Sequence, residues 1–247
     1  MTNILVPYHL DEHVPDLDVP VSPEVTITGD LPSGDRWQRM SHLYGSVAAA
    51  VAADIAAGVR PLVMSSDCTT SLGIVAGMQS AGMRPSVVWF DGHGDVQTVE
   101  TSTSGYLGGM PLRILAGYRP ELVADSLGMR PIDESTTLLV GARDLDPPEA
   151  EYLATAPIRR CAVTDVRPDI LPPAPIYLHV DFDVTDPADL PGLLFPTADG
   201  PGVATVAAAI DRVLDTRRVA AIGLGCTWHP GNGAADRVRT ALAGILP

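Results

Sequence analysis

Short apolar runs alternate with longer alanine-rich stretches along most of this chain, and this alternation constrains the fold more than any other feature. These β-branched or apolar runs predict strands at residues 4–7, 61–65, 86–91, 137–141, 159–163, 176–183 and 219–225. Stretches of helical character lie at residues 42–57, 69–83, 148–154, 203–215 and 234–245. Strands that alternate with helices favour βαβ units and a parallel sheet covered by helices on both faces. The predicted fold class is α/β, with an open, mostly parallel β-sheet as the middle of three layers.

Nothing in the sequence divides the chain into separate units. Its 247 residues are an ordinary length for one α/β domain with a sizeable core. The 23 prolines and 23 glycines gather between the expected elements, and neither a repeat of fixed period nor a long linker is apparent. Residues 8–36 are polar, contain proline and are hard to assign. We expect a single domain over residues 1–247.

Charge and composition exclude some classes of partner. The chain has 16 basic and 30 acidic residues, and its net charge of −14 repels nucleic acid and anionic membrane surfaces. No apolar stretch reaches the roughly 18 residues of a membrane span, and the opening run MTNILVPYHL lacks a signal-peptide pattern. Three cysteines (Cys68, Cys161, Cys226) are too few for a disulfide framework, which favours a reduced, cytoplasmic protein. The expected partner is a small-molecule substrate, with no nucleic acid and no membrane; self-association into a homo-oligomer stays open.

Unusual polar residues follow four of the expected strands. Residues 65–68 (SSDC) follow one strand, residues 91–95 (DGHGD) a second, residues 181–183 (DFD) a third and residues 226–229 (CTWH) a fourth. In an open parallel sheet, ligands bind beyond the carboxyl ends of the strands. Four separate loops are therefore predicted to meet at one edge of the sheet.

Two acidic clusters at this edge indicate a metal site. Asp91, His93 and Asp95 are spaced two apart, so on extended backbone their side chains share one face. Asp181 and Asp183 repeat this spacing on another strand. One such cluster is also typical of a capping loop or a solvated strand end, but carboxylates held this close repel unless a cation lies between them. Two clusters that each end an apolar strand favour a divalent metal, and oxygen-rich ligands with one imidazole favour Mn²⁺ over Zn²⁺.

These motifs resemble those of the ureohydrolase superfamily of arginases and agmatinases. Residues 91–95 resemble its DAHxD motif, and residues 179–187 (HVDFDVTDP) resemble its SxDxDxxDP motif. Residues 65–69 (SSDCT) stand in the place of GGDHS, and residues 141–149 (GARDLDPPE) look like the segment that holds a substrate's α-amino group. The resemblance spans roughly residues 60–230. It implies the arginase-like three-layer fold and a metal-dependent hydrolase that cleaves a C–N bond of a guanidino-type small amino compound, through a hydroxide generated by two metals.

The resemblance also implies a role for each matching residue. The implied metal ligands are Cys68, Asp91, His93, Asp95, Asp181 and Asp183. Asp95 and Asp183 would bind one ion with Cys68 in the place of a histidine, His93 would bind the second ion, and Asp91 and Asp181 would bridge or share the pair. The implied substrate-binding residues are Gln97 and Ser104 for an α-carboxylate, and Asp146 and Glu149 for an amino group. The implied cofactors are two divalent metal ions, Mn²⁺ first, with Zn²⁺ or Fe²⁺ as alternatives because of Cys68.

Cys68 is the first departure from the family pattern. A small buried residue at the start of a helix, with one metal lost, would explain it, and so would a coordinated thiolate, since a bound metal deprotonates a thiol. A thiolate in the place of a neutral imidazole makes the site more anionic. The metals become weaker Lewis acids, and the preference moves towards softer ions.

Two further departures concern proton transfer and substrate charge. Gly108 stands where arginases have a histidine that shuttles protons, and loss of a general acid typically costs about 10²–10⁴ in rate. No carboxylate stands at Thr227 or Trp228 to pair with a guanidinium. His229 could restore a proton donor, although a solvated or packing role is the usual one for a histidine in such a loop. The candidate catalytic residues are His229 and two aspartates of the predicted metal site, Asp91 and Asp95. Tyr106 could line a pocket, although packing is the more usual role of such a residue.

The cysteine together with the run GYLGG at residues 105–109 is similar to a sub-branch that includes the N-hydroxyarginine hydrolase of D-cycloserine biosynthesis. An N-hydroxyguanidine is less basic than a guanidine and can bind without a paired carboxylate. Three functions are compatible with the sequence: a hydrolase of such an N-substituted guanidine, an ordinary arginase- or agmatinase-type ureohydrolase, and a non-catalytic relative that keeps the fold or the metal site.

Overall fold

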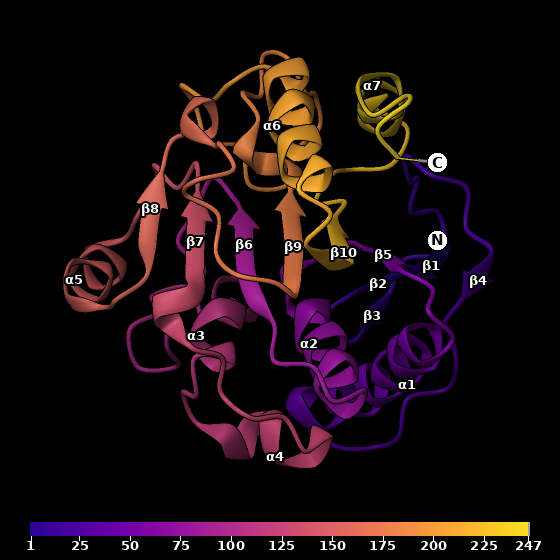
Figure 1. The fold of residues 1–247 in the computed structure, drawn as a ribbon. Coiled ribbons are helices and arrows are strands. Elements are labelled where there is room, and N and C mark those ends of the chain that lie inside the picture. The colour runs from indigo at the N-terminus through magenta and orange to yellow at the C-terminus, as the bar shows by residue number, and fades with distance from the viewer. Residues whose placement is uncertain (247) are drawn as a thin grey trace.

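The computed structural model describes residues 1–246, and an eight-stranded sheet forms its centre (Figure 1). In spatial order the strands are β4 (Val25–Thr26), β1 (Thr2–Val6), β5 (Pro61–Ser65), β10 (Val219–Gly225), β9 (Ile176–Asp181), β6 (Ser86–Phe90), β7 (Thr137–Val140) and β8 (Arg159–Cys161). Every neighbouring pair in this sheet is parallel. A separate antiparallel pair, β2 (Tyr8–His9) and β3 (Glu12–His13), lies outside it.

Helices cover both faces of the sheet, so the predicted three-layer α/β class is confirmed (Figure 1). The helices are α1 (Arg36–Ala56), α2 (Ser71–Ser80), α3 (Pro111–Leu115), α4 (Ala124–Leu127), α5 (Pro147–Thr155), α6 (Val203–Asp215) and α7 (Ala234–Ala241). Helices α1 to α4 pack on one face, and α6 and α7 pack on the other. In β9, Leu178 and Val180 join the core beneath α6 and α7, while Tyr177 joins the opposite core. Because both faces are buried, the central strands are mostly apolar, and His179 in β9 is an exception.

The polar segment that the sequence left unassigned contains short strands and the start of a helix. α1 begins at Arg36, six residues before the predicted start at residue 42. Asp35 caps it: its Oδ1 accepts from the Gln38 backbone N–H at 3.0 Å, and the Gln38 side chain accepts from the Asp35 N–H. At other elements, β8, β9, α2 and α7 end earlier than predicted, and α3 and α4 were not predicted.

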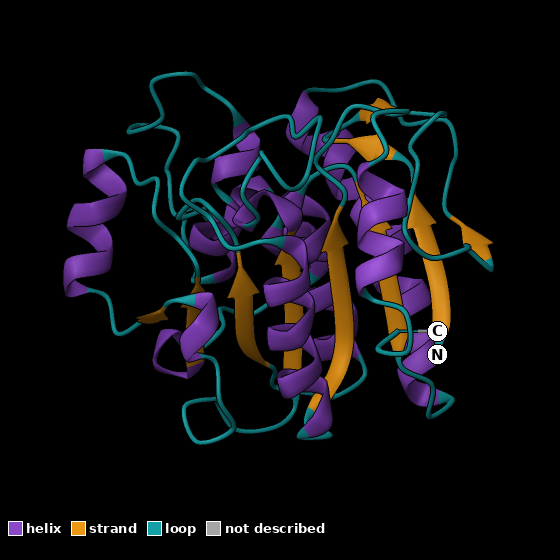
Figure 2. Ribbon diagram, turned by 90° about the horizontal axis from the view of Figure 1, so that it is seen from above, coloured by secondary structure: helices purple, strands orange, loops and turns teal. Residues whose placement is uncertain are grey.

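The long loops gather at the carboxyl ends of the strands, at the arrowheads in Figure 2. All four polar segments singled out in the sequence lie at this edge, because β5, β6, β9 and β10 are adjacent or nearly adjacent parallel strands. Over residues 1–246, none of the helices combines the length and the apolar character that a bilayer crossing requires.

Candidate metal centre and active site

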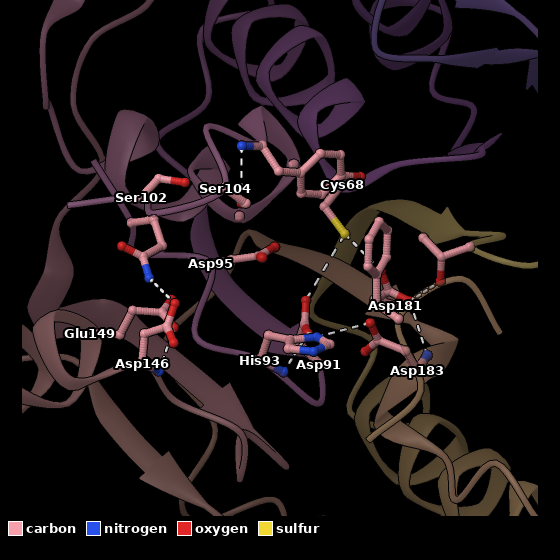
Figure 3. Close-up of a pocket in the computed structure, with 16 residues that line it drawn as sticks. Cys68, Asp91, His93, Asp95, Ser102, Ser104, Asp146, Glu149, Asp181 and Asp183 are labelled. Carbon is pink, nitrogen blue, oxygen red and sulfur yellow. Dashed lines mark hydrogen bonds and ion pairs between the residues drawn. The ribbon is translucent and has the colours of Figure 1, made fainter. Parts of the chain in front are cut away.

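A cavity of about 430 Å³ opens beyond the carboxyl ends of the central strands (Figure 3). Its lining residues are Cys68, Asp91, His93, Asp95, Gln97, Ser102, Ser104, Tyr106, Gly108, Gly109, Asp146, Glu149, Asp181, Asp183, Phe195 and Thr227. The structure therefore brings together every residue predicted as a metal ligand or a substrate contact. His229, predicted as a catalytic residue, does not line this cavity.

His93 lies between two carboxylates on one side of the cavity. Its Nδ1 is 3.0 Å from Asp183 Oδ2 and 3.4 Å from Asp91 Oδ1. Burial opposes protonation of the imidazole, but Asp183 and Asp91 outweigh burial and raise the pKa of His93 to about 12. Burial would raise the pKa of Asp91, but His93 lowers it to about 2; burial and the charge of Asp91 raise the pKa of Asp183 to about 6. These carboxylates require positive charge beside them, which a proton on His93 supplies in part.

Cys68 brings a sulfur atom to the other acidic cluster. It opens the short 3₁₀ turn Cys68–Thr70 that precedes α2. Its Sγ lies 2.8 Å from Asp181 Oδ2 and 4.0 Å from Asp91 Oδ2. Burial and the charges of Asp181, Asp95 and Asp91 raise the pKa of the thiol well above its usual range. The thiolate becomes the stable form only when a cation lies beside the sulfur.

Two more carboxylates, Asp95 and Asp181, are buried beside the same acidic groups. Asp95 Oδ2 is buried and has no hydrogen-bond partner among residues 1–246, and the backbone of this residue has a φ of 55°. Burial and the charges of Asp91 and Asp181 raise the pKa of Asp95, and burial with the charges of Asp183 and Asp91 raises the pKa of Asp181. Buried charges without partners are costly. Divalent ions would remove this cost, so the donor set fits the metal pair that the sequence implies.

The loops after β6 and β9 are fastened to each other. The Gly92 N–H donates to Asp183 Oδ1 at 3.0 Å. A Cβ at Gly92 would lie 2.8 Å from the Asp183 carbonyl oxygen, so only glycine allows this approach. Arg143 donates to the carbonyls of Asp183 and Thr197, at 3.3 and 2.7 Å. The Thr197 hydroxyl lies 3.2 Å from His93 Nε2 and supports the ring from its other nitrogen. These contacts fix the spacing of the two acidic clusters.

The residues expected to bind an amino acid lie at the opposite end of the cavity (Figure 3). Gln97 Nε2 donates to Asp146 Oδ2 at 2.7 Å, so the two side chains form one polar unit. Glu149 is buried, and its two oxygens accept from the backbone N–H groups of Val96 and Asp146, at 3.2 and 3.1 Å. Asp146 and Ser104 are exposed and can therefore meet a ligand. Gln97 is as buried as Glu149 but lines the cavity through its contact with Asp146, while Glu149 joins α5 to the loop after β6.

Tyr106 occupies the volume that any side chain at position 108 would take. A Cβ at Gly108 would lie 2.3 Å from Cε1 and Cζ of Tyr106 and 2.4 Å from its Oη. The Tyr106 hydroxyl is 3.1 Å from His9 Nε2, and His9 Nδ1 is 2.9 Å from the Ser66 carbonyl oxygen. A carbonyl only accepts, so Nδ1 carries a proton, and Nε2 of a neutral His9 accepts from Tyr106. The glycine thus allows a tyrosine hydroxyl, backed by a histidine, to enter the cavity.

The segment after β10 corrects the prediction for His229. Thr227 lines the cavity, and its hydroxyl donates to Asp181 Oδ1. Trp228 is buried in the core, where its indole N–H donates to the Asp18 carbonyl and carboxylate, at 3.1 and 3.0 Å. His229 is exposed, and its backbone N–H donates to the Gly192 carbonyl at 2.8 Å. The Trp228 indole and the hydrogen bond from the His229 backbone fix this segment. The His229 imidazole therefore lies outside the cavity and supplies no proton donor there.

Sequence reasoning missed three side chains near the acidic clusters: Phe195, Thr197 and His179. Phe195 and Thr197 lie in an irregular loop that carries no motif. His179 carried a signal, because it stands in an otherwise apolar strand where the family motif has serine. Burial lowers the pKa of His179 to about 3, which keeps its imidazole neutral.

Comparison with known proteins gives one consistent result. The arginase family is the family whose model matches this chain, over residues 7–224. The chain is 32% identical to the arginase of Bacillus caldovelox over 168 residues, which cover 62% of this chain and 56% of that protein. It is 29% identical to the N(omega)-hydroxy-L-arginine amidinohydrolase of Streptomyces lavendulae over 189 residues, which cover 75% of this chain and 66% of that protein. The matched part thus spans less than two thirds of the length of these relatives.

Solved structures share the whole architecture. The native arginase of Bacillus caldovelox superposes with a TM-score of 0.82 at 23% identity, over 99% of this chain and 97% of that chain. An Entamoeba histolytica arginase in complex with L-ornithine gives a TM-score of 0.80 at 18% identity, over 99% and 97% of the two chains. At these identities the likeness shows the fold alone.

Proposed function

The chain belongs to the arginase family, and we propose that its cavity is the active site of a hydrolase that cleaves a C–N bond of a guanidino-type small amino compound. The observation that carries this proposal is the arrangement of the cavity lining. A cluster of buried carboxylates with Cys68 and His93 lies at one end, and the polar unit of Gln97 and Asp146 lies at the other. One end suits metal chemistry and the other suits the amino-acid end of a substrate.

The residues that would hold two divalent ions are Cys68, Asp91, His93, Asp95, Asp181 and Asp183. When bound, such ions supply Lewis acidity and a nucleophilic water. Mn²⁺ suits the carboxylates, whereas the Cys68 sulfur favours Zn²⁺ or Fe²⁺ at its position. A thiol used in this way persists only in reducing surroundings, which agrees with a cytoplasmic location.

We further propose that the substrate is N-hydroxylated at its guanidino group. Thr227, which lines the cavity and donates to Asp181, offers a hydroxyl where a guanidinium would need a carboxylate. A less basic N-hydroxyguanidine does not need that ion pair. The name of the Streptomyces lavendulae relative, an N(omega)-hydroxy-L-arginine amidinohydrolase, supports the same substrate class. Asp146 would accept from the substrate's amino group, and Gln97 and Ser104 would donate to its carboxylate.

Tyr106 and His9 would serve the leaving group in the place of the family's histidine. In neutral His9 the Tyr106 proton points to Nε2, and the tyrosine oxygen can accept from the substrate. When His9 takes up a second proton, Nε2 donates to the tyrosine oxygen, and the Tyr106 proton is free to move to the departing nitrogen. Burial and the neighbouring charges of Asp67 and Cys68 raise the pKa of Tyr106, so it keeps its proton between turnovers.

Product analysis tests this function. Protein loaded with Mn²⁺, Zn²⁺ or Fe²⁺ is given N-hydroxy-L-arginine or L-arginine, and hydroxyurea, urea and ornithine are quantified. We expect hydroxyurea from the first substrate and little urea from the second, with Asp183→Asn as the inactive control. Stoichiometric metal without turnover of either compound would instead support the non-catalytic relative. Fast urea release from arginine would support an ordinary ureohydrolase.

A further inference from the structure

His179 lies directly behind the predicted metal ligands, on β9, two residues before Asp181. It is 2% exposed, and its ring stacks on Trp89 with 3.7 Å between the ring centroids. Nδ1 faces two hydroxyls, Ser71 Oγ at 3.1 Å and Tyr177 Oη at 3.3 Å. The imidazole is thus held in one orientation by stacking on its face and by polar contacts at one nitrogen.

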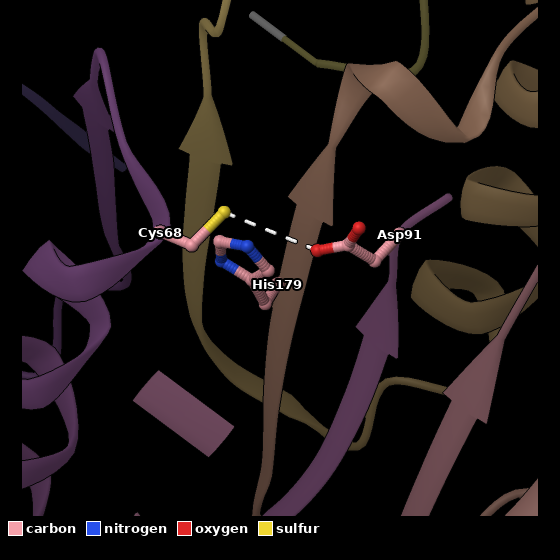
Figure 4. Close-up of side chains that lie close together, drawn as sticks. All are labelled: Cys68, Asp91 and His179. Carbon is pink, nitrogen blue, oxygen red and sulfur yellow. Dashed lines mark hydrogen bonds between the residues drawn. The ribbon is translucent and has the colours of Figure 1, made fainter. Parts of the chain in front are cut away.

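The other ring nitrogen of His179, Nε2, is buried and has no partner in the part of the chain that the structure describes. A ring nitrogen of His179, the Cys68 sulfur and an Asp91 oxygen all lie within 4.8 Å of one another. In Figure 4 the imidazole lies beside the line that joins Cys68 to Asp91, with its nitrogen atoms on the side of Cys68. A buried nitrogen without a partner is costly, and a cation between these three groups would satisfy it.

We infer that His179 is a metal ligand, and that its imidazole takes the place of the histidine ligand that the family has at position 68, where this chain has cysteine. In the family motifs, position 68 is a histidine and position 179 is a serine; this chain has cysteine and histidine. If Nδ1–H donates to the hydroxyls of Ser71 or Tyr177, the lone pair of Nε2 is available to a metal. Hydrogen bonding at the second nitrogen is the usual way in which proteins orient a ligating imidazole.

The inference predicts that the two metal positions differ in character. Cys68, His179 and Asp91 form a sulfur, nitrogen and oxygen set, which suits Zn²⁺ or Co²⁺. Asp91, His93 and Asp183 form an oxygen-rich set with one imidazole, which suits Mn²⁺. Asp183 thus groups with His93, 3.0 Å away, and not with Cys68 as the resemblance implied. The inference rests on the metal centre of the proposed function but not on the proposed substrate, and it is tested by metal binding alone.

Titration of the chelator-treated full-length protein with Co²⁺ and Zn²⁺ tests this ligand. In the wild type, Co²⁺ should give a thiolate-to-cobalt charge-transfer absorption from Cys68. His179→Phe keeps an aromatic ring against Trp89 but removes the nitrogen. It should weaken Co²⁺ and Zn²⁺ binding at this position at least about tenfold, because even the loss of a residue that only supports a ligand typically costs that much metal affinity. The matched control is Tyr177→Phe, which removes one hydroxyl beside Nδ1 and leaves Ser71, and should keep the charge-transfer band and most of the affinity.

A second measurement does not depend on how His179→Phe folds. In a His93→Asn protein loaded with one equivalent of Zn²⁺, an imidazole signature in the X-ray absorption spectrum should persist, and His179 is the residue that would supply it. Loss of that signature, or wild-type Co²⁺ affinity and spectrum in a folded His179→Phe protein, would overturn the inference. Failure to hydrolyse any guanidino compound would leave these binding results unaffected, so the two failures can be told apart.

Discussion

Gly108→Ala adds a single methyl group at the point where Tyr106 enters the cavity. The new Cβ would lie 2.3 Å from the tyrosine ring, whereas ordinary contacts begin at 3.4 Å, so the ring must move by about 1.1 Å (3.4 minus 2.3). Because the atoms that clash are at the far end of the side chain, the ring can swing away and the fold should survive. The hydroxyl then leaves both the cavity and His9 Nε2, now 3.1 Å away.

A displacement of about 1 Å at a reacting group can cost about 10²-fold in rate. We therefore expect kcat for N-hydroxy-L-arginine to fall about a hundredfold in Gly108→Ala, or about 2.7 kcal/mol of transition-state stabilisation. Tyr106→Phe should produce a loss of about 10²–10⁴, typical of a missing general acid. Melting temperature should change little in both variants, because the hydrogen bond to His9 is worth only about 1 kcal/mol.

Gly109→Ala is the matched control for this experiment. Its nearest neighbour would be Gln97 Cγ at 3.7 Å, an ordinary contact, and neither glycine has a positive φ. Hydroxyurea release, measured as kcat and KM for the three variants, decides the matter. The reasoning about Tyr106 is refuted if Gly108→Ala keeps near wild-type kcat, or if Gly109→Ala loses as much activity as Gly108→Ala.

Four further predictions follow from the same site. L-Arginine should be a poor substrate, because Thr227 offers no carboxylate; urea release at tens per second or more would contradict this. Cys68→His should keep metal but favour Mn²⁺ over Zn²⁺ more strongly than the wild type does, whereas Cys68→Ala should weaken one metal position. Elemental analysis of the two variants beside the wild type checks this. Equal Mn²⁺ and Zn²⁺ contents in all three proteins would contradict it. In metal-free protein, burial raises the pKa of Asp183 from 3.8 to about 6. The folded chain therefore binds this proton more readily than the unfolded chain does. The free energy of unfolding in urea should fall as the pH rises from about 4 to about 6. A flat or rising trend would oppose this account. His229→Ala should leave kcat close to that of wild type, because the His229 side chain is exposed and lies outside the cavity; a large loss of kcat would return His229 to the mechanism.

The inner strands of the sheet could be predicted because they are buried on both faces and appear as nearly unbroken apolar runs. The strands Tyr8–His9, Glu12–His13 and Val25–Thr26 have two residues each, which is too short for a periodic pattern. The first turn of α1 has Trp37 as its one apolar residue among Arg36, Gln38 and Arg39, so its start depends on the capping contacts of Asp35 more than on hydrophobic spacing. Local pattern therefore determined what could be predicted of the fold.

The candidate site divides in the same way. The acidic clusters could be identified because each one is a short run with spacing of two at a strand end. The contact of Tyr106 with His9 joins residues 97 positions apart, and no local pattern encodes it. His229 lies outside the cavity because its neighbour Trp228 is buried in the core and hydrogen-bonded to Asp18, which is 210 positions away in the sequence. Motif spacing thus locates the centre, whereas long-range packing decides which other side chains reach it.

The carboxylate of Glu149 constrains how this protein can acquire new substrates. It accepts from the backbone N–H groups of Val96 and Asp146, and so joins α5 to the loop that begins at Asp91. Truncation would leave two backbone donors without partners, at about 1–3 kcal/mol each. Ser104 is exposed, and water can replace its contacts. Directed evolution towards other amino compounds should therefore accumulate changes at Ser104 early, and changes at Glu149 only in backgrounds that already carry stabilising mutations.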